Sequence, residues 1–236
     1  MKKILTFLAA LLFVNISTAQ TATDDALYRR LTAEGDDSVA ALKEVLARPE
    51  SVSAALLYVA SGAALKEKHL KDSGFLFYVA RFRGQFDREM FPPTEAGGDS
   101  PMVLLGALQQ QMGSVVNPAL MAEPKVFAKV LAQVKLWSPQ VPVDYSPGWA
   151  FSKKGNTEQA EAAFQAGRKK FLGGMEGFCM LLQDDAYFAA FRIVQDYNLK
   201  SGSERPSKAA FDTAMKTMER IETEKGIEGI ALKSKK

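Results

Sequence analysis

The sequence has very few of the residues that build disulfide frameworks and metal sites. It contains one cysteine, Cys179, and one histidine, His69, in 236 residues. A single thiol excludes an intramolecular disulfide, so apolar packing has to stabilise the fold. One thiol and one imidazole also fall short of the ligands that a zinc site normally uses. We therefore expect neither a metal ion nor a cofactor.

Familiar catalytic signatures are missing as well. The chain has no G-x-S-x-G elbow, no Walker loop and no H-E-x-x-H sequence. Asp184 and Asp185 are neighbours, but successive helical positions point about 100° apart, so the two carboxylates do not share a site. The sequence assigns no catalytic residue. It leaves open a glycosidase, which needs only two carboxylates brought together by folding.

Strand patterns and an excess of one charge are also absent. No alternating apolar run is bounded by hairpin turns, and neither Asn-Gly nor Asp-Gly occurs. The 30 basic and 27 acidic residues give a net charge of +3. Loss of Lys2 and Lys3 with a signal peptide would leave 28 against 27, or +1. This balance lacks the basic surface of nucleic-acid-binding proteins, so we expect no nucleic-acid partner.

The first nineteen residues do carry a clear pattern, that of a secretory signal. Two lysines precede an apolar run from Ile4 to Ile16, and small residues at 17–19 suit a signal peptidase. The apolar run of about 13 residues is too short to span a bilayer comfortably. We predict cleavage after Ala19 and a periplasmic or secreted bacterial protein without stable membrane insertion.

Helical periodicity and capping residues dominate from Asp24 onward. Proline- and glycine-rich stretches at 91–99 and 138–147 interrupt it, as do Asn117-Pro118 and Gly173-Gly174. The sequence predicts an all-α fold of antiparallel helical hairpins, in one domain over 20–225 with a frayed tail over 226–236. The alternative is two helical lobes that meet near 139–147. The expected helices, about ten in number, cover 26–34, 39–47, 52–66, 70–86, 102–112, 126–137, 147–154, 158–172, 176–197 and 209–225.

One segment has the spacing of a repeat unit. Small and aromatic residues follow Gly148 at 3, 7, 12, 16 and 19 positions: Phe151, Gly155, Ala160, Phe164 and Gly167. Small residues let two helices approach closely, and the large ones fill the groove beside them. The segment resembles a tetratricopeptide repeat, which implies a two-helix unit over 148–172 with these six residues packed between its helices.

A weaker copy of the same spacing lies over 62–86. Gly62, Leu65, Gly74 and Tyr78 match it, whereas His69 stands at the position of the turn glycine. The resemblance implies a helical-repeat protein that presents a groove to a protein or peptide.

The expected helix over 70–86 also suggests a contact surface. Its aromatic stripe should face the core. Arg81, Arg83, Asp87 and Arg88 should lie on the opposite face, beside the loop that contains Pro92 and Pro93. Long loops on a rigid helical scaffold often carry function, so we predict that these six residues bind a partner. The alternative is a solvated helix face beside an ordinary loop.

Two functional hypotheses follow. The first is an exported helical-repeat protein of the bacterial envelope that binds a protein or peptide; an immunity protein against a delivered toxin is one concrete version. The second is a periplasmic hydrolase that acts on glycan with two carboxylates. Export and the missing catalytic motifs favour binding.

Overall fold

A computed structural model describes residues 20–95, 97, 98, 100–143, 145–229 and 231. The predicted signal peptide, residues 1–19, lies outside this range. The structure is 76% helical, with nine α-helices and no strand among the described residues. This confirms the predicted all-α fold. No helix in the described part is both long and apolar enough to cross a membrane.

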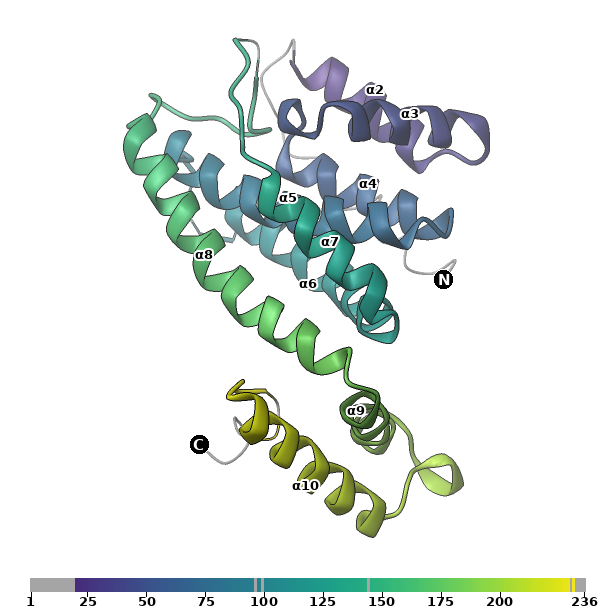
Figure 1. The fold of residues 1–236 in the computed structure, drawn as a ribbon. Helices are drawn as coiled ribbons and strands as arrows, with labels where there is room; N and C mark the ends of the chain where they lie inside the picture. Colours follow the sequence, from purple (N-terminus) through teal and green to yellow (C-terminus); the bar gives the residue numbers. More distant parts are fainter. Residues whose placement is uncertain (1–19, 96, 99, 144, 230, 232–236) are drawn as a thin grey trace.

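The helices form a main body and a smaller C-terminal unit (Figure 1). Helices α2 to α7 build the body, α8 runs along its edge, and α9 and α10 lie beyond the far end of α8. Short 3₁₀ turns occupy Pro49–Ser51 and Gly202–Glu204. The α-helices are α2 (Gln20–Thr32), α3 (Asp36–Ala47), α4 (Ala54–Lys66), α5 (Leu70–Met90), α6 (Pro101–Ala122), α7 (Pro124–Leu136), α8 (Thr157–Leu182), α9 (Asp185–Leu199) and α10 (Lys208–Lys225).

Helix α5 is the centre of the body and packs against α4, α6, α7 and α8. Its sequence explains this position, because residues 76–80 are five consecutive apolar residues and all are buried. A helix that is apolar all round must be covered on every side. Gly74 lets α6 and α7 approach closely, since a Cβ there would lie 2.9 Å from Leu120 Cδ1 and 3.1 Å from Val130 Cγ2.

The C-terminal unit shares the hydrophobic core of the body. Helices α9 and α10 pack on each other, and their buried residues, which include Ala190, Val194, Ala214 and Met218, belong to the same apolar cluster as those of the body. Side chains cap both helices: Asp184 accepts a hydrogen bond from the Tyr187 amide, and Ser207 accepts one from the Ala210 amide. The unit joins the body through α8.

Two predicted helix breaks are wrong. Helix α6 continues through Pro118 to Ala122, and α8 continues through Gly173 and Gly174 to Leu182. Apolar side chains are buried on both sides of each predicted break. Their burial offsets the free-energy cost of a proline or of glycines inside a helix. Val116 and Leu120 are buried around Pro118. Leu172 and Cys179 are likewise buried around the glycine pair.

The helix predicted over 147–154 is also wrong, because this segment is irregular. Gly148 adopts a positive φ of 89°. Phe151 forms an isolated antiparallel bridge with Pro93. The two-helix unit implied by the resemblance is therefore not formed over 148–172, since its first helix is absent.

The tail beyond α10 is packed rather than frayed in its described part. Gly229 is buried, and Ala231 is 2% exposed. The cause is Glu222, a buried carboxylate of α10 that accepts a hydrogen bond from the Ala231 amide at 3.0 Å. The rest of the predicted tail, residues 230 and 232–236, lies outside the described residues.

Candidate functional site

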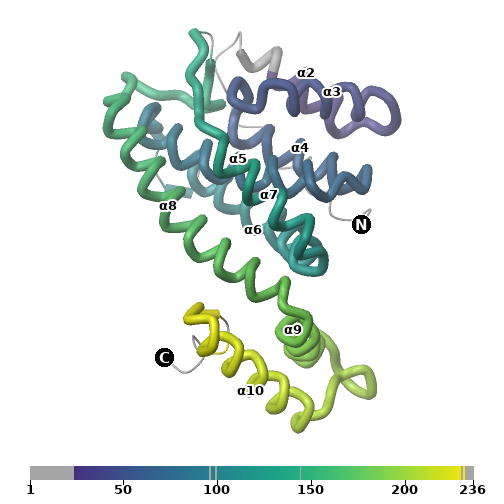
Figure 2. The backbone as a smooth tube through the Cα atoms, in the orientation of Figure 1, coloured from purple at the N-terminus to yellow at the C-terminus, as the bar shows by residue number. Residues whose placement is uncertain are grey.

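The two long loops are joined into a single surface at one end of the body. The Trp149 Nε1–H donates to the Phe91 carbonyl at 2.7 Å, and the Gly155 amide donates to the Met90 carbonyl at 2.7 Å. The Thr94 amide donates to the Ala150 carbonyl at 3.2 Å. We call residues 91–95, 138–143 and 145–155 the loop platform. Figure 2 shows its longer part rising above the helices after α7 and returning to the start of α8.

The Arg83 guanidinium lies beneath this platform and is completely buried. Its Nη1 donates to two backbone carbonyls, that of Gln140 at 2.6 Å and that of Glu50 at 2.9 Å. Its Nε donates to the Tyr145 hydroxyl at 2.8 Å. One side chain of α5 thus ties the 3₁₀ turn before α4 to two points of the platform.

Asp87 lies one turn further along α5 and is also fully buried. The Tyr145 hydroxyl donates to Asp87 Oδ2 at 2.5 Å. Asp87 Oδ1 lies 2.9 Å from Arg83 Nε, but this contact is an ion pair rather than a hydrogen bond, because Nε directs its hydrogen at Tyr145. We call Arg83, Asp87 and Tyr145 the clamp.

Burial dominates the electrostatics of the clamp. It raises the pKa of Asp87 to about 6, against the lowering effects of the Arg83 charge and of the hydrogen bond from Tyr145. Burial and the neighbouring Asp87 charge raise the pKa of the Tyr145 hydroxyl well above its usual value. At neutral pH the clamp therefore contains a carboxylate, a guanidinium and a neutral phenol.

The clamp contributes more to the orientation of the loop platform than to the stability of the fold. Removing two charges from water costs several kcal/mol per ion, and their attraction often only offsets that cost. The guanidinium fixes directions, because its planar donors each need a partner in one place. It also stacks on Tyr145, with Cζ 3.6 Å from the ring centroid. The clamp therefore holds the platform in one orientation relative to α5.

The outer surface of the platform combines apolar and basic side chains. Val143, within the loop between α7 and α8, is 102% exposed, and Leu136, the last residue of α7, is 87% exposed. Lys153 and Lys154 are exposed on the returning segment, and the Lys154 ammonium lies 5.7 Å from the Phe91 ring centroid. An apolar tip on a fixed loop is suited to contact with another molecule.

The six residues predicted to bind a partner fall into three groups, exposed, half-buried and fully buried. Pro92 and Arg88 are exposed, Arg88 in an ion pair with Glu89 at 2.9 Å. Pro93 and Arg81 are half-buried; the Arg81 guanidinium lies 4.6 Å from the Phe171 ring centroid. Placing the other two, Arg83 and Asp87, on an exposed helix face was wrong. The platform covers that face of α5 and turns both into internal connectors.

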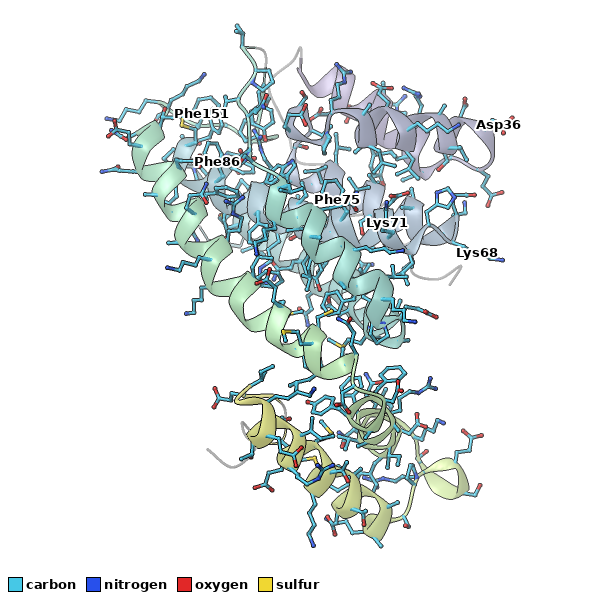
Figure 3. All side chains as sticks on the ribbon, viewed as in Figure 1. Asp36, Lys68, Lys71, Phe75, Phe86 and Phe151 are labelled. Carbon is cyan, nitrogen blue, oxygen red and sulfur yellow. The ribbon has the colours of Figure 1, made fainter. Side chains whose placement is uncertain are left out.

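The six residues predicted to pack within a repeat contact other parts of the chain. Ala160 and Phe164 of α8 are buried, and the Phe164 ring meets Phe82 and Phe86 of α5. Gly167 faces Gln85, and a Cβ on Gly155 would lie 2.1 Å from the Glu89 carbonyl oxygen. Gly148 lies near Ser53, and the Phe151 ring packs on Phe91 at 4.9 Å. In Figure 3, Phe86 and Phe151 both lie near the start of α8. Most of this set packs against α5 and the loop that follows it.

Sequence reasoning missed Tyr145 and Trp149, the two side chains that anchor the platform. Both lie in a proline-rich stretch without periodicity, so no local pattern marks them as buried. One signal was present: Arg83 and Asp87 are four residues apart on a helix, the spacing of an ion pair, beside two core phenylalanines.

The remaining candidates for chemistry do not form a centre. Among the described residues, no group of three His, Cys, Asp or Glu side chains is placed to hold a metal ion. The buried carboxylates there are Asp87 and Glu222, and each belongs to a separate hydrogen-bond network. Cys179 is buried in α8, and burial raises the pKa of its thiol.

Comparison of the chain with models of protein families, with curated proteins and with solved structures found no match.

Proposed function

We propose that this chain is an exported helical binding protein of the bacterial envelope, and that it contacts a protein or peptide through the loop platform. The carrying observation is the clamp, in which buried charges hold two irregular segments rather than the helical core. A fixed surface loses less conformational entropy on binding than a flexible one does.

The chemistry of the platform supports a macromolecular partner. Its exposed tip offers an aliphatic side chain, Val143, and its returning segment offers two lysines. Apolar anchors with charged residues around them are the usual composition of protein-binding surfaces. The hydrolase alternative has no comparable support, because the buried Asp87 carboxylate is paired with Tyr145 and Arg83 rather than with a second carboxylate.

The test is a pull-down from native envelope extract with the chain that begins at Gln20, read by mass spectrometry. Val143→Asp places a charge at the tip, and it should reduce capture of a partner about tenfold or more. Leu199→Asp is the matched control, since Leu199 is 80% exposed on α9 in the C-terminal unit. It should leave capture unchanged.

Tyr145→Phe adds a second arm, because it removes the hydroxyl that links Arg83 to Asp87 without touching the outer surface. Partial loss of capture is expected from a loosened platform. Equal capture by the wild-type and Val143→Asp chains would sink the proposal, as would the absence of any partner at both low and moderate salt.

A further inference from the structure

Arg81 is a charged residue of α5 that the loop platform does not use. It lies two positions before Arg83, so the two side chains leave the helix toward nearly opposite faces. Arg83 pairs with Asp87, four positions further along its own face. The same position relative to Arg81 holds Gln85, a neutral amide whose Oε1 lies against Gly167 and accepts no hydrogen bond. The face of α5 that carries Arg81 therefore offers it no acid.

The guanidinium of Arg81 is half-buried against α8. Its Cζ lies over the Phe171 ring, 4.6 Å from the centroid. This cation–π contact is not a hydrogen bond, so it leaves the five N–H donors of the side chain available. Within the part of the chain that the structure describes, Arg81 forms neither a hydrogen bond nor an ion pair.

This makes Arg81 different from the other arginines that are withdrawn from water. Four arginines are buried or half-buried among the described residues, namely Arg30, Arg81, Arg83 and Arg168. Arg30 pairs with Glu44, Arg83 with Asp87, and Arg168 donates to the Trp137 carbonyl and to Gln165. Hydrogen bonds to a charged group are stronger than neutral ones, and a partly desolvated cation gains most from an acceptor of opposite charge. An anion would complete the set at Arg81.

Neutral polar groups surround the same face of α5. The Tyr58 hydroxyl of α4 donates to Gln109 Oε1 at 3.4 Å. The Tyr78 hydroxyl donates to Asn117 Oδ1 at 3.0 Å. Because both amides of α6 accept through oxygen, their nitrogens remain as donors. Burial raises the pKa of each tyrosine hydroxyl, and the Arg81 charge lowers it, so this charge acts on the polar groups around it.

We propose that Arg81 is the centre of an anion-binding site that takes a small monocarboxylate. The two carboxylate oxygens accept hydrogen bonds from the planar fork of the guanidinium, which suits carboxylate geometry. One positive charge in neutral surroundings is matched by one negative charge. A phosphate group carries nearly two at neutral pH, so the site favours the carboxylate. The site does not depend on the function proposed for the loop platform, and either can fail alone.

The test is a titration of the full chain with acetate at constant ionic strength, followed by the NMR signals of the arginine Nε–H groups and of the Gln109 side-chain amide. The Arg81 signal should shift and saturate. Arg81→Gln should weaken the affinity measured at the Gln109 amide about tenfold or more. Arg192→Gln is the matched control, because Arg192 is exposed on α9 and has no ion pair among the described residues. It should leave the affinity unchanged.

Two further comparisons make the result specific. Arg81→Lys keeps the charge and loses the fork, so it should bind acetate about threefold or more weakly than wild type does. It also carries the test should Arg81→Gln fail to fold. Inorganic phosphate, as a second probe, should bind more weakly than acetate.

Three outcomes overturn the proposal. The first is equal acetate affinity in wild type and in both Arg81 variants. The second is a shift at Arg192 that matches the one at Arg81, since this would show ion pairing at any arginine. The third is tighter binding of phosphate than of acetate, which would contradict a site for a single negative charge.

Discussion

A buried arginine needs acceptors for its donors. At Arg83 two segments far apart in the chain supply them to Nε and Nη1, whereas Nη2 is buried without a hydrogen-bond partner among the described residues. Carbonyls come from Glu50 and Gln140, and Tyr145 supplies a hydroxyl. Lysine could not replace it, because an ammonium is a compact point charge without a planar fork of donors. Arg83 is therefore a positioning residue for the loop platform.

Tyr145→Phe should lower the free energy of unfolding by about 1–3 kcal/mol, because it leaves Asp87 Oδ2 buried without its donor. Urea denaturation measures this. Tyr197→Phe, at a half-buried tyrosine of α9, is the control and should cost about 0.5 kcal/mol or less. A Tyr145→Phe cost no larger than that of the control would show that the hydroxyl contributes nothing.

The Asp87 carboxyl should also give the protein a measurable pH dependence. Its pKa is about 6 in the folded chain against an ordinary value of 3.8 for an aspartate, so the folded state binds the proton more readily. Its contribution to stability is fully present below about pH 4 and is lost as pH rises through 6. The stability of wild type relative to Asp87→Asn should therefore rise as pH falls from 7 to 4. A difference independent of pH would contradict the raised pKa.

At the scale of helices, the sequence located most elements and misjudged where they stop. Capping residues marked real starts at Ser100, Asn156 and Ser207, each of which accepts a backbone hydrogen bond. Pro118 and the Gly173-Gly174 pair were expected to end helices, but both helices continue because the residues around these positions are buried. The low helix propensity of proline and glycine can be read from the sequence. The packing that offsets it comes from helices far away in the chain.

The loop platform could not be derived from local patterns for the same reason. Arg83 and Asp87 were selected as functional residues, but their exposure was wrong, because the segment that covers them begins more than fifty positions later. Trp149 and Phe151 were expected on a helix and instead bind the loop after α5. Only the folded chain shows which irregular segment lies on which face.

Glycines of α8 and of the segment before it offer a test of this distinction. Gly173→Ala and Gly174→Ala should each raise the free energy of unfolding by about 0.5–1 kcal/mol, because both are helical and a Cβ there meets nothing within 4 Å. Gly155→Ala should instead destabilise the protein by about 1–3 kcal/mol, since its Cβ would collide with the Glu89 carbonyl. Thermal unfolding of the three variants measures these changes. A change in the free energy of unfolding with the same sign for all three would refute this account.

At the scale of the whole molecule, the helices form two parts. The body carries the loop platform beside the start of α8, and the C-terminal unit lies beyond the far end of that helix (Figure 1). Helix α8 joins them as one continuous element of 26 residues.

Export is the prediction that concerns the chain as a whole. Expression of the full sequence in a Gram-negative bacterium should give a periplasmic or secreted product that begins at Gln20. Intact-mass spectrometry should show loss of residues 1–19. A product that retains them in the membrane fraction would indicate an uncleaved anchor instead.

The clamp also bears on the order in which the protein folds. Its hydrogen bonds join residues 33, 57 and 62 positions apart, whereas α4 and α5 meet across a turn of three residues. Closing long loops is entropically slow, so contacts between neighbouring helices should form before the clamp does. Stopped-flow kinetics of Tyr145→Phe should then show faster unfolding with an unchanged refolding rate. The loop platform would be the last part of the body to assemble and the first to open.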